Sequence, residues 1–343
     1  MQSIGVAGHL CLDIAPRLTS EAALRPGRLV EVGALAISLG GCVANTGGAL
    51  ADLGADVTPF AFVGDDDLGA LLLAHLEARG FAENHVWISP GSTTSYSLVI
   101  ESPGTDRTFW HHTGANDEFD GTRVGVVDRD IVHVGYPPLL PGMLVDDGRP
   151  LQELLARART AGATTSLDLA VVDPNSPAGA RDWATILHRA FSECDVASPS
   201  LDDLTSALRI DEPYSLALVD RLADQMLSDG VAVVGISAGR HGLHVRTGSA
   251  DRLRSAGAAL APLADRWADR SLTLQPTWIE DAVTTNGAGD ASTAGLLFGM
   301  LRGASIEQAA ALAAACAALV MRGRRTTVAA VTSLSPSLAS LMS

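Results

Sequence analysis

From about residue 130 onward, short apolar runs alternate with longer segments whose apolar residues recur at helical spacing. The apolar runs predict buried strands at 131–134, 164–169, 196–198, 231–236 and 243–246. The segments between them predict helices at 150–161, 181–192 and 215–228. Such alternation favours a largely parallel sheet that is covered by helices on both faces. The chain is therefore expected to adopt an α/β fold.

The first and last thirds of the chain extend this pattern. Buried strands are predicted at 4–8 and 57–63, and helices at 44–54, 68–79, 288–302 and 305–322. Two further strands, 93–100 and 107–112, are separated by Ser102-Pro103-Gly104 and indicate a hairpin. A strand-like run also covers 277–283. The simplest organisation is one α/β domain built from 1–13, 36–90 and 113–343, with a small β excursion at 14–35 and 91–112.

The absence of lysine limits how this chain could bind phosphate. All 24 positively charged residues are arginine. A Walker A loop needs a lysine near the transferred phosphates, and protein kinases need one on a strand, so both are excluded. Schiff-base chemistry on lysine is excluded for the same reason. If the protein binds a nucleotide, backbone amides, arginine or a metal ion must neutralise its phosphates.

Charge and hydrophobicity narrow the range of partners. The net charge of -15 counts against a nucleic-acid partner, which would require a basic face. Hydrophobic residues make up 47% of the 343 residues, which allows a sizeable core. The longest apolar stretch, 308–321, is too short to span a bilayer and predicts a buried helix, so no membrane partner is expected. Four separated cysteines without a CxxC pair, and no basic segment at the N-terminus, favour a cytoplasmic location.

Gly287-Ala288-Gly289-Asp290 is the segment best suited to chemistry. It lies between the strand-like run 277–283 and an apolar helix that begins near Ala291. Amides at a helix N-terminus and the helix dipole favour an anion, and small residues let the backbone approach it. A carboxylate beside such an anion is suited to accept the proton of a substrate hydroxyl. The structural alternative is that Asp290 only caps the helix.

Two other clusters invite a metal interpretation. His111 and His112 are adjacent on a predicted strand, so their side chains point to opposite faces, which argues against one ion binding both. A contact with substrate and an exposed position on the β excursion are the two alternatives for this pair. The run Asp65-Asp66-Asp67 is better explained as a solvated turn and the start of a helix.

Several motifs, in order along the chain, resemble the PfkB/ribokinase family of carbohydrate kinases. The C-terminal signature of that family is similar to Thr284-Thr285-Asn286-Gly287-Ala288-Gly289-Asp290-Ala291. The other signature resembles Gly40-Gly41-Cys42-Val43-Ala44-Asn45-Thr46, followed by Leu53-Gly54-Ala55 and Val63-Gly64-Asp65-Asp66. Further similar segments are Arg107-Thr108-Phe109, Gly114-Ala115-Asn116 and Ile236-Ser237-Ala238-Gly239-Arg240-His241-Gly242. The resemblance runs from Gly5 to about Arg324.

The resemblance implies a ribokinase-like three-layer αβα sandwich with a mostly parallel central sheet and a small β lid. It implies that Asp290 is the base that deprotonates the acceptor hydroxyl. The backbone amides of Gly287, Ala288 and Gly289 would form the anion hole for the transferring phosphoryl group. The acceptor-binding residues that it implies are Asp13, Gly40, Gly41, Asn45, Arg107, Asn116 and Asp168. The nucleotide-binding residues are Ser200, Ser237, Gly239, Gly242, Thr285 and Ala314.

Three positions depart from the family pattern. Thr284 replaces an aspartate that helps to bind a monovalent cation, which leaves activation by potassium open. Ser200 and Asp203 stand where the family has Asn-x-x-Glu, so Asp203 is the expected metal residue, holding Mg²⁺ through water. Asp168-Leu169-Ala170 replaces the Asp-Pro-Asn of many sugar kinases, so the sequence does not identify the sugar.

These features predict an ATP-dependent kinase that uses Mg²⁺ and phosphorylates a hydroxyl of a sugar or related polyol. One alternative is a nucleoside kinase of the same fold, which aromatic residues in the lid would favour, although only 4% of the residues are aromatic. Another is a catalytically inactive sensor that binds a sugar or nucleotide, for which the changes at Ser200 and Thr284 leave room. A homodimer formed through the β lid is also predicted.

Overall fold

The computed structural model describes residues 3–18, 26–27, 29–81, 85–101, 107–275, 279 and 282–342. Within this part of the chain, nine strands form one sheet in the order β13-β12-β11-β10-β9-β8-β1-β4-β5. The pairs β11–β12 and β12–β13 are antiparallel, and every other neighbouring pair is parallel. The strands are β1 (Ser3–Gly8), β4 (Asp56–Gly64), β5 (Val86–Ser89), β8 (Ile131–Gly135), β9 (Thr164–Asp168), β10 (Val196–Ala197), β11 (Val233–Ser237), β12 (Leu243–Thr247) and β13 (Ser271–Leu274).

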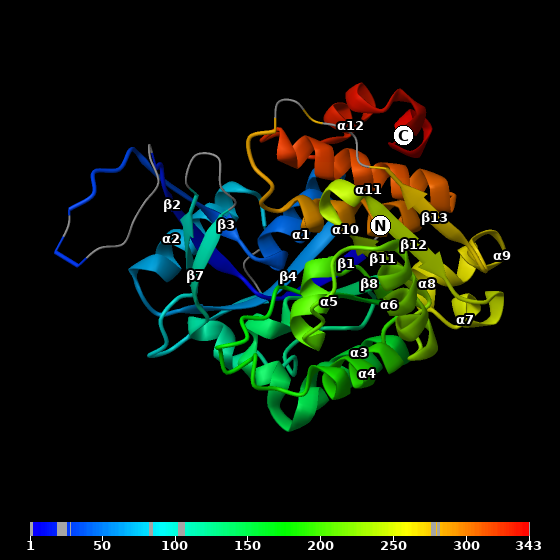
Figure 1. Cartoon of the computed structure of the whole chain (residues 1–343), viewed down its shortest axis with the longest axis horizontal. Helices are drawn as coiled ribbons and strands as arrows, with labels where there is room; N and C mark the ends of the chain where they lie inside the picture. Colours follow the sequence, from blue (N-terminus) through cyan, green and yellow to red (C-terminus); the bar gives the residue numbers. More distant parts are fainter. Residues whose placement is uncertain are drawn as a thin grey trace.

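Helices cover both faces of this sheet (Figure 1). One face packs against α1 (Cys42–Asp52), α2 (Asp67–Ala78), α10 (Ala288–Leu301) and α11 (Ile306–Met321). The other packs against α3 (Arg149–Thr160), α4 (Trp183–Ser192), α5 (Leu201–Leu208) and α6 (Leu216–Ser228). Adjacent residues of β1 point to different sides, since Val6 belongs to the first core and Ala7 to the second. The architecture is a three-layer αβα sandwich, as predicted.

Five short helices complete the first core. They are α7 (Ala250–Arg254), α8 (Gly257–Leu260), α9 (Ala264–Trp267), α12 (Val328–Leu334) and α13 (Ala339–Met342), and each contributes buried residues to it. Helices α10 and α11 approach each other closely because small residues face the contact. A Cβ added to Gly295 would lie 2.7 Å from the Cα of Ala313. This close packing fixes the start of α10, which carries Asp290.

A second sheet of four strands, here called the lid sheet, stands beside the central sheet (Figure 1). Its order is β3-β2-β6-β7, with β2 (Cys11–Pro16), β3 (Leu35–Gly40), β6 (Tyr96–Ile100) and β7 (Thr108–His112). Only His9 and Leu10 separate β1 of the central sheet from β2 of the lid sheet. Strands β6 and β7 pair antiparallel, which confirms the predicted hairpin, although Ser102-Pro103-Gly104 lies outside the described residues.

The predicted alternation of strands and helices after residue 130 is confirmed, as are the predicted helices of the first and last thirds. The sequence did not predict β3, β5, β13 or α5. The strand-like run 277–283 falls largely outside the described residues, and its last two residues, Ala282 and Val283, are not in a strand. The division into an α/β domain and a β lid stays a prediction. Strand β2 crosses its limit between residues 13 and 14, and β3 crosses its limit between residues 35 and 36.

Candidate active site

The carboxylate of Asp290 lies in the first turn of α10, and only 3% of the residue is exposed. Gly287 precedes the helix in a left-handed conformation, with φ of 74°, which glycine adopts without steric cost. Three side chains from other elements donate hydrogen bonds to the carboxylate. They are Asn45 Nδ2 at 3.2 Å, Thr46 Oγ1 at 2.8 Å and the Tyr136 hydroxyl at 2.6 Å. The carboxylate is therefore held in one orientation by groups that do not belong to its own helix.

Two opposing effects act on the pKa of Asp290. Burial raises the pKa above its ordinary value, and the negative charge of Asp13 adds to the increase. The three hydrogen bonds lower the pKa, because each donor stabilises the ionised form. Burial is the larger effect, so the net shift is upward. The arrangement produces a buried carboxylate that is more basic than an exposed aspartate.

The segment Gly287-Ala288-Gly289, here called the glycine segment, borders open space. A Cβ added to Gly289 would meet no heavy atom within 4 Å. Gly289 also lines a small depression together with Ser198, Ser237 and Thr293. The first amides of a helix have no partner within the helix, and they point outward from its N-terminus. The amide of Ala288 donates a 3.3 Å hydrogen bond to the carbonyl of Thr285. The depression thus places hydroxyl groups beside an N-terminus that can bind an anion.

Asp13 occupies the face of the lid sheet that is turned toward α10. Its side chain accepts a 2.9 Å hydrogen bond from Asn286 Nδ2, and burial raises its pKa. Gly40 lies against this carboxylate, because an added Cβ would be 2.5 Å from Asp13 Oδ1. The predicted residues Asp13 and Gly40 are therefore neighbours, and Asn286 connects Asp13 to the glycine segment.

A row of polar residues crosses all four strands of the lid sheet. The strand register aligns Ser38 with Asp13, Asp13 with Ser97, and Ser97 with His111. Residues paired in this way share one face of the sheet. The row presents two hydroxyls, a carboxylate and an imidazole on the side that carries Asp13, which is the chemistry that hydroxyl groups of a ligand require.

His111 reaches from the lid sheet to the end of β1. Its Nε2 lies 3.3 Å from Nε2 of His9, and its Nδ1 lies 3.0 Å from the hydroxyl of Ser97. His9 also stacks against the ring of Tyr136, with ring centroids 5.8 Å apart. Burial lowers the pKa of His111 to about 4 and that of His9 well below 6.5. Both rings are therefore neutral at pH 7, and one can donate to the other.

The predicted separation of His111 and His112 is confirmed. His112 interacts with Thr93 at 2.8 Å, whereas His111 contacts His9. Across the described ranges, no group of three or more His, Cys, Asp or Glu residues is arranged to hold a metal ion. The run Asp65-Asp66-Asp67 begins α2, and Asp66 caps that helix by accepting a hydrogen bond from the Gly69 amide.

Asp168 and Asp203 are the buried carboxylates on the other side of the glycine segment. Asp168 ends β9, and Asp203 forms a capping box with Ser200 at the start of α5. Burial raises the pKa of Asp203 to about 6. Burial, Asp203 and Asp290 together raise the pKa of Asp168 well above its ordinary value. Carboxylates that repel each other in this way form a set of oxygen donors that suits a hard cation such as Mg²⁺, which commonly uses one or two carboxylates and keeps several waters.

The residues predicted to bind a nucleotide lie at three places, near the ends of β10 and β11, before α10 and on α11. Ser200 and Ser237 pair in an isolated bridge near the ends of β10 and β11. Gly239 opens a short turn that ends at Gly242, where an added Cβ would strike the carbonyl of Leu274. Thr285 accepts a hydrogen bond from Arg107, so it joins the lid sheet to the glycine segment. Ala314 is partly buried on α11.

The remaining predicted acceptor residues have structural contacts. Asn116 is fully buried and donates a 3.0 Å hydrogen bond to the carbonyl of Leu10, so its amide supports the turn between β1 and β2. Gly41 begins α1 with φ of 86°, and an added Cβ would lie 2.6 Å from Nδ1 of His9. Arg107 lies over the ring of Phe109, 5.4 Å from its centroid.

Sequence reasoning missed several side chains that surround Asp290 and Asp13: His9, Thr46, Ser97, Tyr136 and Asn286. Tyr136 directly follows β8, and ligands of open α/β sheets bind near the carboxyl ends of the strands, which could have drawn attention to it. Thr46 and Asn286 lie inside the quoted motifs and could have been included. Nothing in the sequence pairs His9 with His111.

Comparisons with known proteins identify the family. The sequence profile described as pfkB family carbohydrate kinase matches residues 1–332. An ATP-dependent ribose-1-phosphate kinase from Halopiger xanaduensis is 27% identical over 91% of this chain and 90% of its own length. A 2-dehydro-3-deoxygluconokinase from Bacillus subtilis is 24% identical over 82% of this chain and 80% of its own length.

The structure also resembles solved structures. Ribokinase from Arabidopsis thaliana, complexed with ribose and ATP, has a TM-score of 0.74 at 18% identity, covering 97% of this chain and 99% of that one. A nucleoside kinase from Burkholderia thailandensis, in complex with inosine, has a TM-score of 0.69 at 19% identity, covering 96% of each chain. The predicted ribokinase-like fold is thereby confirmed. Because the family profile covers nearly the whole sequence, this protein belongs to the pfkB family of carbohydrate kinases, phosphotransferases whose acceptor is an alcohol group.

Proposed function

We propose that this member of the family transfers the γ-phosphoryl group of ATP to a hydroxyl of a sugar or related polyol, with Asp290 as the base. The single observation that supports this most is the environment of Asp290. Its carboxylate is buried, oriented by three donors and placed one residue after Gly289, which borders open space. A base must be oriented toward the proton that it takes, and its pKa must be raised toward the working pH.

The acceptor binds between the lid sheet and α10. Its reacting hydroxyl donates to Asp290, and its other hydroxyls contact the polar row that runs from Ser38 to His111. Contacts of Asn286 and Arg107 bring the lid sheet against the glycine segment, which excludes water from the reacting groups. Asp290 accepts the hydroxyl proton as the oxygen attacks the phosphorus in line with the leaving ADP oxygen.

The phosphates of ATP lie beside the N-terminus of α10. The amides of Gly287, Ala288 and Gly289 donate to the transferring group, that of Ala288 in place of its 3.3 Å hydrogen bond to the carbonyl of Thr285. Donors of this kind stabilise charge as it develops. Asp203 and Asp168 are the residues that would hold Mg²⁺ through water, and the ion when bound neutralises phosphate charge. The ATP chain extends toward Ser200, Ser237 and Gly239. Nothing in this arrangement requires lysine.

A nucleoside acceptor is the second candidate, because an aromatic ring is available on the face of the lid sheet that carries Asp13, here called the acceptor face. Phe109 is two positions from His111 on β7, so both side chains share one face of the lid sheet. The residue Phe109 is 42% exposed, and Arg107 lies over its ring. A flat base could stack in the same place, which would suit a nucleoside. The inactive-sensor alternative is disfavoured by the hydrogen bonds that orient Asp290.

We also infer that the chain forms a homodimer through the lid sheet. Large apolar side chains are exposed there, and they include Leu35 at 56% and Trp110 at 44%. Sedimentation analysis of the purified protein tests the dimer, and a monomer at micromolar concentration would contradict it.

In the part of the chain that the structure describes, no helix is long and apolar enough to cross a membrane.

A panel of sugars, polyols, sugar derivatives and nucleosides tests the proposed reaction by ATP consumption and by detection of the phosphorylated product. The Asp290→Asn variant should bind ATP and acceptor but lose turnover by about 1,000-fold, as expected for loss of a general base. Asp211→Asn, at an exposed aspartate after α5, is the control and should keep normal turnover. Near-normal turnover of Asp290→Asn would exclude Asp290 as the base.

A further inference from the structure

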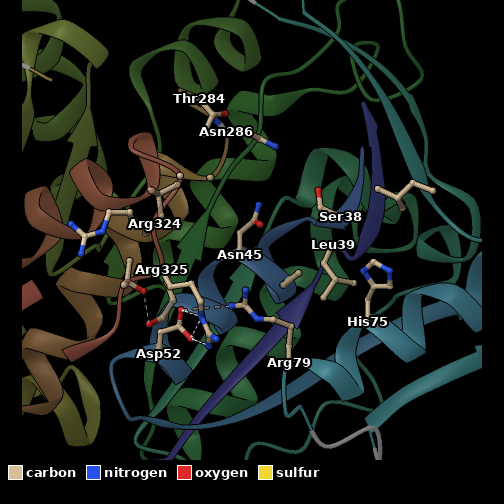
Figure 2. A pocket seen from close by; sticks show the side chains of 18 residues that line it. Ser38, Leu39, Asn45, Asp52, His75, Arg79, Thr284, Asn286, Arg324 and Arg325 are labelled. Atoms are coloured by element: carbon tan, nitrogen blue, oxygen red, sulfur yellow. Dashed lines mark hydrogen bonds and ion pairs between the residues drawn. The ribbon is translucent and has the colours of Figure 1, made fainter. Parts of the chain in front are cut away.

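A pocket of about 430 Å³ opens at the β3 edge of the lid sheet (Figure 2). Its walls come from β3, α1, the end of α2, the segment before α10 and the segment after α11. These elements are far apart in sequence, so the pocket is created by the fold. No residue of the polar row except Ser38 lines it, and Asp290 does not line it.

Three side chains link the wall of the pocket to the acceptor face. Asn45 lines the pocket and also donates to Asp290. Asn286 lines the pocket and also donates to Asp13. Ser38 belongs to the pocket wall and is aligned with Asp13 across β2 and β3. A ligand whose hydroxyl reaches Asp290 could therefore extend past Ser38 into this pocket.

The far end of the pocket is positively charged. Arg79 and Arg325 both interact with Asp52, whose side chain is only 4% exposed. Figure 2 shows the two guanidinium groups converging on Asp52, whereas Arg324 points away from them. Among the described residues that line the pocket, these three arginines are accompanied by one carboxylate. The charge of Asp52 thus neutralises one of the two converging arginines and leaves an excess of positive charge.

Both converging arginines keep donors for a ligand. Arg325 binds Asp52 through Nε and Nη2, which leaves N–H groups of its five for another acceptor. Among the described residues, Arg79 interacts with the same carboxylate through a 3.7 Å ion pair. Gly48, which lies on α1, leaves space for the side chain of Arg79, because a Cβ added to Gly48 would lie 2.8 Å from Nη2 of Arg79. The position of Arg79 is therefore set by packing as well as by charge.

The distance between the two ends of the pocket suits a small, extended acceptor. Asn45 at one end and Asp52 at the other are seven residues apart on α1. At roughly 1.5 Å of rise per residue, this separation is about 10 Å along the helix axis. A phosphorylated pentose, or a six-carbon sugar acid, spans a similar length between its terminal hydroxyl and its anionic group.

We propose that the acceptor is an anionic sugar whose phosphate or carboxylate binds Arg79 and Arg325 at the far end of this pocket. This inference rests on the proposed kinase function and adds the substrate class to it. Guanidinium groups bind phosphate and carboxylate through paired N–H donors, so both anions fit the same site. A neutral sugar gains nothing from the two arginines and leaves this end of the pocket filled with water.

Matched acceptors test the proposal directly. Ribose is compared with ribose 1-phosphate, and 2-dehydro-3-deoxygluconate serves as the carboxylate probe. At low ionic strength, the preferred anionic acceptor should have a kcat/KM at least about tenfold above that of ribose, and added salt should reduce the difference. A kcat/KM for ribose that equals or exceeds the values for both anionic probes would overturn the proposal.

Substitutions locate the effect. Arg325→Gln and Arg79→Gln should each raise the KM of the anionic acceptor roughly 10- to 100-fold and leave kcat and the KM of ribose nearly unchanged. Arg325→Lys should restore part of the affinity. Because a lone buried carboxylate is destabilising, the paired variant Asp52→Asn/Arg325→Gln removes both charges together and protects the fold. Arg254→Gln, at an exposed ion pair on α7, is the matched control.

Binding separates this proposal from the kinase proposal. If no acceptor is phosphorylated, the kinase proposal fails. Thermal stabilisation by ribose 1-phosphate then tests whether the pocket binds an anionic ligand. Stabilisation that is lost in Arg325→Gln but kept in Arg254→Gln supports the anionic ligand. No stabilisation of the native protein, or equal stabilisation of both variants, contradicts it.

Discussion

The hydroxyl of Tyr136 donates a 2.6 Å hydrogen bond to Oδ2 of Asp290, across 154 residues of sequence. Tyr136 adopts a left-handed conformation with φ of 65°, which costs a residue with a side chain on the order of 1 kcal/mol. Pro137 follows Tyr136, and the ring of Tyr136 stacks against His9. Such a conformation persists only when the surroundings determine it. Here it brings the phenol into contact with Asp290.

We predict that Tyr136→Phe shifts the acid limb of the kcat/KM profile to higher pH. The hydroxyl stabilises the ionised form of Asp290, so its loss raises the pKa of that carboxyl further. Turnover near pH 7 should fall roughly tenfold, as expected for loss of a hydrogen bond to a charged group. The measurement is kcat/KM of the best acceptor from pH 5 to 9.

Tyr96→Phe is the control for that variant, since Tyr96 packs at a tilt against His112 and is not among the groups that shift the pKa of Asp290. Its profile should match the native one. An unchanged acid limb in Tyr136→Phe would show that the phenol does not influence the titration of Asp290.

We predict that Gly289→Ala folds normally but loses activity. Gly289 is helical and an added methyl group meets no atom within 4 Å, so stability should be unchanged or rise by up to about 1 kcal/mol. The methyl group would enter the space proposed for the transferring phosphoryl group, so turnover should fall about 100-fold or more. Thermal unfolding and steady-state kinetics give the two measurements.

Gly47→Ala provides the comparison. Gly47 lies within α1, and an added Cβ would make only ordinary contacts of 3.6 Å with Phe81 and Val57. This variant should keep both stability and turnover. If Gly289→Ala retained native turnover, the open space beside it would not be the phosphoryl site.

We predict that Gly40→Ala weakens acceptor binding selectively. Its φ is not positive, so the substitution strains no backbone angle, but the Cβ would lie 2.5 Å from Asp13 Oδ1. The carboxylate must move, which should raise the KM of the acceptor at least about tenfold through lost hydrogen bonds to a charged group. The KM of ATP should stay within twofold or so. Equal increases in both values would argue against a specific role for Asp13.

We predict that Asp203 contributes stability that is lost as pH rises through the range in which it titrates. Its pKa is about 6 in the folded protein against an ordinary value of 3.8, so the folded state binds more protons at this group between these values. The contribution of this group to the unfolding free energy must then decrease with rising pH, by roughly 1–3 kcal/mol. The lowered pKa values of His9, His111 and His133 act in the opposite direction, so a substitution is needed to isolate the part that comes from Asp203.

Denaturant unfolding at pH 5 and pH 8 measures this effect. Asp203→Asn should shift the stability at pH 8 relative to pH 5 upward, whereas Asp211→Asn, at an exposed aspartate after α5, should leave the native pH dependence unchanged. The same pH dependence in Asp203→Asn as in the native protein would contradict the assigned shift.

The layers of the fold were predictable because they depend on local patterns. Apolar runs and helical spacing identify strands and helices without knowledge of their partners. Strand β3 was missed because it lies at the edge of the lid sheet, where Leu35 and Ala36 are exposed and the apolar signal has no consistent face. Strand β5 is only four residues long and occupies the edge of the central sheet.

The candidate site was predictable only where its residues are contiguous. Asp290 and its glycines form one short segment, and a helix start gives that segment a physical meaning. Tyr136 and Thr46 meet Asp290 only after three elements have packed together. The polar row across the lid sheet depends on strand register, and the Asp52 cluster depends on the packing of α1, α2 and the segment after α11. Such convergence leaves no mark in a single sequence.

The lid sheet has a consequence for how acceptor preference can change in this scaffold. Its strands come from three separate stretches of chain, and β2 leaves the core only two residues after β1. Replacing the whole sheet with that of another protein would place the junctions between the two sequences beside His9, Gly40 and His112, inside the acceptor site itself. New preferences that depend on this sheet must therefore arise by substitution on its inner face, one side chain at a time, while the connections stay as they are.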